Sequence, residues 1–299
     1  MRTLLLGEAL VDLICERPVS HMHDADAFVP HFGGAVANVA VAAARRGAAV
    51  ALAGGAGDDA WGSWLRDRLE AERVDLDWFG LVPSVLTPIA FVTIDLRGEP
   101  SYAIYGDAIQ AVIEALEGRI ERAVDRCDAL FVTSNTLVGE RERAITTAAR
   151  DRALEQGKPL LFDPNLRLHR WPEPAQAATE ARALVRDAFL VKCNAEEARL
   201  LSGEEDPEAA AEGLIAAGAQ HAVVTRGARG AVLRGGGMRL DVPGEPAHPI
   251  SAVGAGDAFM GTVIAGLAAT RFYPPAIGAA LRDAVVEGAR ATERWGALD

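Results

Sequence analysis

Short apolar segments alternate with helical stretches through most of the chain, and this rhythm limits the folds that it can adopt. In the second half, residues 129–133, 159–162, 189–192 and 222–225 are almost wholly apolar. Strands that are apolar throughout are typical of a parallel sheet with helices on both faces. We therefore predict an α/β fold, a three-layer α/β/α sandwich with a mostly parallel central sheet. The helices between these strands are expected at 141–156, 174–186, 195–201 and 207–217.

The first hundred residues depart from this rhythm twice. Residues 87–96 and 101–105 alternate with a period of two around a turn that contains Gly98 and Pro100, which indicates a β-hairpin. The stretch from residue 12 to 31 is extended or irregular. We expect these pieces, about 12–32 and 86–107, to form a small β-sheet lid on a single domain that spans residues 1–299.

The remaining elements follow from the same patterns. The helix at 59–73 is expected to bury Trp61, Trp64, Leu65 and Leu69. A second hairpin is expected at 231–242. The other predictions are strands at 3–6 and 48–53 and helices at 34–46, 256–269 and 275–295.

Charge and cysteine content exclude several classes of function. The formal net charge of −12 argues against a nucleic-acid partner, because the DNA and RNA backbones are themselves anionic. Cys15, Cys127 and Cys193 show no paired spacing, which favours a reducing compartment. No apolar run approaches ~18 residues, so no membrane partner is expected. We predict a cytoplasmic protein that acts on small molecules.

Gly254-Ala255-Gly256-Asp257 stands directly before an apolar helix. The glycines let backbone N–H groups converge, and the helix dipole favours an anion there. Asp257 is suited to accept a proton from a hydroxyl that attacks a bound phosphate. The same residues would also serve as an ordinary capped helix start, so the motif alone leaves both interpretations open.

Three further motifs follow predicted strands or precede helices. Gly33 and Gly34 precede a helix that carries Asn38, whose amide can both donate to and accept from sugar hydroxyls. Asp163-Pro164-Asn165-Leu166-Arg167 suits a substrate or phosphate contact but also ordinary turn chemistry. Asn194 and Glu197 suit Mg²⁺ held through water, or simply a capping box. Ligands in open α/β sheets bind outside the carboxyl ends of the strands, where these motifs are expected.

Taken in order, the motifs resemble the ribokinase-like (PfkB-type) carbohydrate kinases over nearly the whole chain. The two glycines with Asn38 resemble the first family signature, and residues 254–257 resemble the second. The opening Gly7-Glu8-Ala9-Leu10-Val11-Asp12, and residues 163–167 with Trp171, look most like the fructokinase and 2-keto-3-deoxygluconate kinase branches. The resemblance implies ATP-dependent phosphorylation of a sugar hydroxyl.

The resemblance also implies a role for each matching residue. Asp257 would be the catalytic base, and Gly254, Ala255 and Gly256 would form with it the anion hole for the transferring phosphoryl group. The other implied contacts are Asp12, Gly33, Gly34 and Asn38 to the sugar; Asn194, Thr225, Gly227 and Gly230 to ATP; Glu197 to Mg²⁺ through water; and Asn165 and Arg167 to phosphate or substrate.

The departures from the family pattern leave some properties open. Ser251 and Ala252 replace the usual Asp-Thr near a monovalent-cation site, so a need for K⁺ is undecided. Gly106 follows Tyr105 where fructokinase-like chains often have Arg, and Val285 replaces an Asn near the adenine, so neither sugar nor nucleotide preference is determined. A homodimer through the lid is implied by resemblance alone. A nucleoside kinase and a catalytically weakened sugar- and nucleotide-binding regulator are the alternatives.

Overall fold

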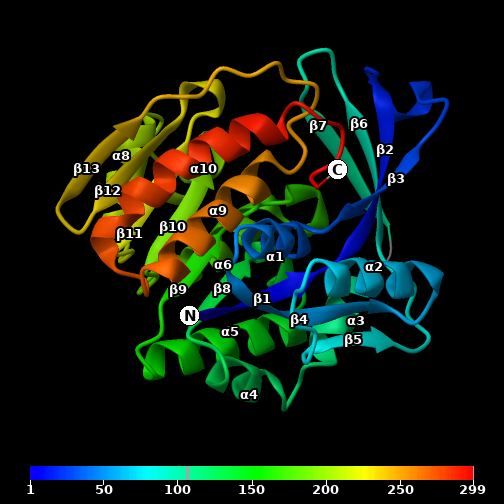
Figure 1. Ribbon diagram of the computed structural model, residues 1–299, viewed down its shortest axis with the longest axis horizontal. Helices are drawn as coiled ribbons and strands as arrows, with labels where there is room; N and C mark the ends of the chain where they lie inside the picture. Colours follow the sequence, from blue (N-terminus) through cyan, green and yellow to red (C-terminus); the bar gives the residue numbers. More distant parts are fainter. Residues whose placement is uncertain (106–107, 299) are drawn as a thin grey trace.

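The computed structural model describes residues 1–105 and 108–298, and over these residues the strands form two sheets. The larger sheet has nine strands in the order β13-β12-β11-β10-β9-β8-β1-β4-β5, and the smaller has four in the order β3-β2-β6-β7. The smaller sheet stands to one side of the larger (Figure 1).

The large sheet is mostly parallel, as predicted. The strands β5, β4, β1, β8, β9, β10 and β11 follow one another in the sheet, and each pairs in parallel with the next. Strand β12 pairs antiparallel with β11 and with β13. All the parallel strands therefore end at the same edge, where ligands bind in such folds. The strands are β1 (Arg2–Glu8), β4 (Ala49–Gly57), β5 (Phe79–Val82), β8 (Ala129–Thr133), β9 (Leu160–Asp163), β10 (Leu190–Asn194), β11 (His221–Thr225), β12 (Ala231–Gly235) and β13 (Met238–Val242).

Two apolar cores, one on each face of this sheet, confirm the three-layer architecture. Alternate side chains of a strand point to opposite faces, so Leu5 enters one core and Leu4 and Leu6 enter the other. The first core is covered by α1 (Ala35–Arg45), α2 (Ala60–Ala71), α9 (Ala255–Ala269) and α10 (Ile277–Ala291) (Figure 1). The second is covered by α3 (Ala108–Glu114), α4 (Ile120–Asp125), α5 (Glu140–Glu155), α6 (Pro174–Val185), α7 (Ala195–Ser202) and α8 (Pro207–Ala216).

The small sheet forms from the two chain segments expected to pair. In it β2 (Leu10–Pro18) runs antiparallel to β3 (Val29–Gly33) and parallel to β6 (Ile89–Ile94), which forms a hairpin with β7 (Pro100–Tyr105). The turn of that hairpin reaches the segment before α9, where the N–H of Ala252 donates to the carbonyl of Gly98 (2.9 Å). Residues 106–107 of the expected lid, and therefore the departure at Gly106, lie outside the residues that the structure describes.

Several local expectations need correction. The strand β5 and the short helices α3 and α4 were not predicted, because elements of four to seven residues carry little periodicity. The last helix ends at Ala291 instead of residue 295. Trp61 is 36% exposed, although we expected it in the core. It lies in the first turn of α2, where its ring meets Trp64 edge-on; Leu65 and Leu69 are buried, and Trp64 is partly buried against the core.

Candidate active site

The first turn of α9 lies at the carboxyl edge of the parallel strands. Gly254 caps this helix with φ of +75°, a left-handed conformation that favours glycine. A Cβ at this position would also lie 2.3 Å from the Cβ of Ala297. Both constraints explain the glycine, and the backbone N–H groups of the first turn that follow it are left for a ligand.

Asp257 lies in this first turn and is buried against α1. The amide nitrogen Nδ2 of Asn38 donates to Oδ2 of Asp257 at 2.9 Å. Burial raises the pKa of Asp257 to about 6, although the Asn38 hydrogen bond and the nearby cations Arg167 and Lys192 act in the opposite direction. The carboxylate is therefore mainly ionised at neutral pH yet close to its pKa, which suits a general base.

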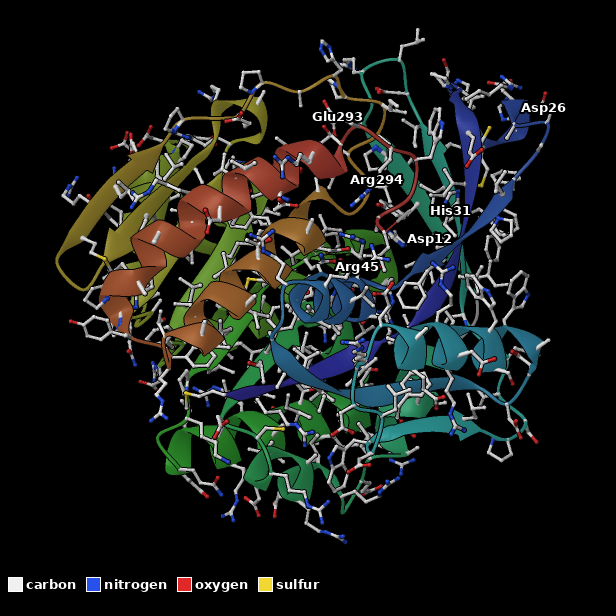
Figure 2. All side chains as sticks on the ribbon, in the orientation of Figure 1. Asp12, Asp26, His31, Arg45, Glu293 and Arg294 are labelled. Carbon is white, nitrogen blue, oxygen red and sulfur yellow. The ribbon has the colours of Figure 1, made fainter. Side chains whose placement is uncertain are left out.

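Asp12 reaches the same place from lid strand β2, and Figure 2 shows it at the base of the small sheet. A Cβ on Gly33 would lie 2.3 Å from Oδ2 of Asp12, so the glycine leaves room for this carboxyl group. Burial raises the pKa of Asp12 to about 8, and the carboxylates of Asp257 and Glu8 add to the rise. In the ligand-free site Asp12 is therefore mostly protonated at pH 7 and can donate a hydrogen bond.

The loop after β9 forms the opposite wall. Asn165 has φ of +42°, and its N–H donates to Oδ1 of Asp163 (3.1 Å), which fixes the turn. The guanidinium of Arg167 lies 5.0 Å from the ring centroid of Tyr102, which comes from lid strand β7. Partial burial acts to lower the pKa of Arg167, but Tyr102 and Asp257 outweigh it and the pKa is raised, so a half-buried positive charge faces the acidic groups.

Asn194 and Glu197 form the capping box of α7. Oδ1 of Asn194 accepts from the N–H of Glu197, and Oε2 of Glu197 accepts from the N–H of Asn194, each at 2.9 Å. Oε1 of Glu197 also accepts from the N–H of Leu166 (2.9 Å). The capping interpretation thus describes the local geometry, yet each carboxylate oxygen keeps a lone pair for water. Within residues 1–105 and 108–298, no group of three or more His, Cys, Asp or Glu residues could hold a metal ion.

Two cavities meet at the start of α9. The first, of about 360 Å³, collects Asp12, Gly34, Asn38, Asn165, Arg167, Asn194, Glu197, Gly254, Gly256 and Asp257. The second, of about 420 Å³, is lined by Gly230 and Ala255 and by the apolar Phe259 and Val285. Thr225, Gly227 and Gly256 line both. With Gly33 beside Asp12, every residue that the sequence analysis named as a catalytic, sugar, ATP or metal contact lies in or next to these cavities.

Other residues that the sequence analysis did not assign to the site also line the first cavity. Among them are the polar residues Glu8, Tyr102, Asn135 and Lys192. Glu8 and Lys192 are charged residues at the carboxyl ends of apolar strands, a signal that could have been used. Tyr102 and Asn135 carry no such signal, because the lid and an irregular turn bring them in.

No helix within the described residues is both long enough and apolar enough to cross a bilayer.

Comparison with known proteins places these features in a family. A model of the "pfkB family carbohydrate kinase" matches residues 2–292. The fructokinase of Vibrio alginolyticus is 32% identical over 98% of this chain and 93% of its own length. A Vibrio cholerae fructokinase structure with fructose, ADP and calcium superposes with a TM-score of 0.86 at 30% identity, covering 99% of this chain and 94% of that one; a double mutant of it holds potassium. The structure of Salmonella enterica aminoimidazole riboside kinase, with its riboside and an ATP analogue, superposes with a TM-score of 0.81 at 26% identity. It covers 100% of this chain and 95% of that one.

Proposed function

The chain belongs to the pfkB family of carbohydrate kinases, and on that premise we propose that it transfers the γ-phosphoryl group of ATP to a hydroxyl of a free ketose or furanose sugar. The observation that carries the proposal is the position of Asp257, buried in the first turn of α9 at the junction of two cavities. One cavity has a wall of carboxylate and amide side chains that suits a sugar. The other has an apolar wall and suits a nucleotide base.

The proposed mechanism assigns the chemistry to this turn. The carboxylate of Asp257 takes the proton of the attacking hydroxyl, and Asn38 orients that carboxylate through its hydrogen bond. The N–H groups of Ala255, Gly256 and Asp257, with Gly254 as the cap, stabilise the charge on the phosphoryl oxygens. Such groups contribute by position and electrostatics, because phosphoryl transfer needs little covalent help from the protein.

The sugar contacts are proposed from the walls of the first cavity. Asp12, Asn38 and the backbone at Gly33 and Gly34 surround the space beside Asp257. Arg167 is a half-buried cation on the other wall, suited to a phosphate oxygen or an acidic group of the substrate. Thr225, Gly227 and Gly230 are proposed to lie along the nucleotide, and Asn165 beside the substrate.

Mg²⁺ is the metal that we propose, held through water by Glu197 beside Asn194. When bound with ATP it would neutralise phosphate charge. For potassium, Ser251 uses its hydroxyl to accept the N–H of Val253 (3.1 Å). Because no carboxylate stands at position 251, we expect turnover in K⁺ and in tetramethylammonium to be similar.

The test of the function is turnover by the purified protein with ATP and Mg²⁺ on fructose, ribose, 2-keto-3-deoxygluconate, tagatose phosphate and adenosine. The Asp257→Asn variant should lose about 10²–10⁴-fold in kcat while its affinity for ATP stays close to that of the parent. Asp283→Asn, on the exposed face of α10, is the matched control. Near-parental turnover by Asp257→Asn would refute the mechanism, and no ADP release with any acceptor would favour the regulatory alternative.

A riboside is the second candidate acceptor. Leu10, Ala90, Ile104 and Ile109 give the first cavity an apolar wall, which a nucleoside base would cover better than a free sugar. The same panel decides between them, because a riboside kinase should prefer adenosine to fructose and ribose.

We also propose that the chain is a single kinase domain and that it forms a homodimer through the outer face of the lid. Tyr105, 60% exposed, contacts Phe91, whose ring also meets Phe28, and an apolar patch of this kind is typical of an interface. Light scattering tests the dimer by comparing the molar mass of Phe91→Glu with that of the parent.

We propose that the protein acts in the cytoplasm. Its three buried free cysteines support a reducing compartment.

A further inference from the structure

Lys192 is one of only two lysines in a chain with 30 basic residues. The other, Lys158, donates to the carbonyl of Val124 (2.7 Å) at the end of α4, away from the candidate site. Lys192 lies near the carboxyl end of β10, and its side chain is only 6% exposed. A chain that otherwise uses arginine almost throughout thus has a compact ammonium group, in place of a wide guanidinium, in the wall of the first cavity.

The ammonium is held by Asp163 on the neighbouring parallel strand. Nζ of Lys192 lies 2.8 Å from Oδ2 of Asp163, whose side chain is 2% exposed. Burial acts to lower the pKa of Lys192, but the carboxylates of Asp163 and Glu197 outweigh it and the pKa is raised. Lys192 therefore stays protonated throughout the neutral pH range, as a fixed cation.

The same ammonium lies beside the start of α9. A Cβ placed on Gly256 would be 3.1 Å from Nζ of Lys192, tighter than an ordinary contact. An ammonium has three N–H donors, and Asp163 accounts for the one hydrogen bond that Nζ makes among the described residues. The other two donors make no hydrogen bond within the described residues, and the lysine lines the cavity. Glycine at 256 thus leaves room for a phosphoryl group between the helix start and the cation.

We propose that Lys192 is a catalytic residue whose ammonium contacts the transferring phosphoryl group, with Asp163 as its positioning residue; this rests on the proposed kinase function. In the step, the acceptor oxygen bonds to the γ-phosphorus while the bond from that phosphorus to the bridging oxygen of ADP breaks. The proton of the hydroxyl goes to Asp257. Lys192 keeps its own proton and offsets the negative charge that moves between the oxygens.

A purely structural ion pair is the competing explanation. It accounts for the burial of both groups, since a buried carboxylate needs a partner. It does not account for the lysine lining the cavity or for its approach to Gly256. The two explanations differ in one measurable respect, namely whether the cation distinguishes a nucleotide that has a γ-phosphate from one that lacks it.

The experiment compares the full-length Lys192→Met, Lys192→Arg and Lys158→Met proteins with the parent. Steady-state kinetics on the best sugar should show a loss of about 10²–10³-fold in kcat for Lys192→Met, as for other phosphoryl- or oxyanion-stabilising donors. Lys192→Arg should recover part of that loss because it keeps the charge, and Lys158→Met should match the parent. Calorimetry should show that Lys192→Met loses about tenfold in the preference for Mg-AMP-PNP over Mg-ADP.

A double variant, Lys192→Met with Asp163→Asn, removes both charges and guards against misfolding. If it restores kcat, the lysine only neutralises Asp163 and the proposal is wrong; a kcat for Lys192→Met within about threefold of the parent overturns it as well. Failure of the proposed function looks different, because the parent itself would then phosphorylate no sugar. In that case the AMP-PNP preference decides alone: its loss in Lys192→Met supports the phosphate contact, and an unchanged preference overturns it.

Discussion

Replacement of Asp12 by Asn should stabilise the ligand-free protein at neutral and alkaline pH. Asp12 is 5% exposed, and burial raises the pKa of its carboxyl group from 3.8 to about 8. The unfolded chain releases this proton near pH 3.8, whereas the folded protein holds it until about pH 8. The free energy of unfolding therefore falls as the pH rises through this window, and Asn, which has nearly the same shape and no charge, removes the loss.

The size of the effect follows from the shift. At pH 7 the solution lies 3.2 pH units above the ordinary pKa of Asp. At about 1.4 kcal/mol per unit, the upper bound on the stabilisation by Asp12→Asn is about 4 kcal/mol. Water entering the cavity reduces this, so we expect about 2–4 kcal/mol, or a rise in Tm of about 5–10 °C. Below about pH 4 both states are protonated and the gain should vanish.

Urea denaturation of the parent, Asp12→Asn and the surface control Asp283→Asn at pH 4, 6 and 8 measures this directly. The gain should appear only in Asp12→Asn and grow with pH. A gain of the same size at pH 4 and pH 8 would show that titration is not its source, and equal stability at pH 8 would refute the reasoning. Because Asp12 is also a proposed sugar contact, the more stable variant should bind its sugar more weakly.

Three other outcomes follow from the site. The profile of kcat/KM against pH should have an acid limb near pH 6, because Asp257 must be ionised to act as base; a limb near pH 4 would contradict its burial. Gly254→Ala should lower the free energy of unfolding by about 1–3 kcal/mol, since the left-handed backbone and the close approach of Ala297 both oppose a Cβ; unchanged denaturation would count against that geometry. Glu197→Gln should raise the Mg²⁺ concentration for half-maximal rate about tenfold, and it should also lower Tm, because Gln has one acceptor oxygen where Oε1 and Oε2 of Glu197 accept from Leu166 and Asn194; an unaltered Mg²⁺ requirement would remove Glu197 from the metal site.

Local pattern was enough to predict most of the framework. Apolar strands and glycine caps are encoded by neighbouring residues, so the parallel sheet, the lid hairpin and the start of α9 were all predictable. Short elements were not, because α3 and α4 hold too few turns to show a period. Trp61 was misplaced for a related reason, since periodicity says which face a residue occupies but not where the interior ends.

The sequence by itself determined where glycines and polar residues follow the strands, and the rule on strand ends then predicted that these segments converge. Only the tertiary structure decided the pairs that set the charges of the site. Asn38 meets Asp257 across 219 positions, and Lys192 meets Asp163 across 29. Hydrogen bonds and pKa values depend on distance and on exclusion of water, and both arise when α1, α9 and the strand ends pack together.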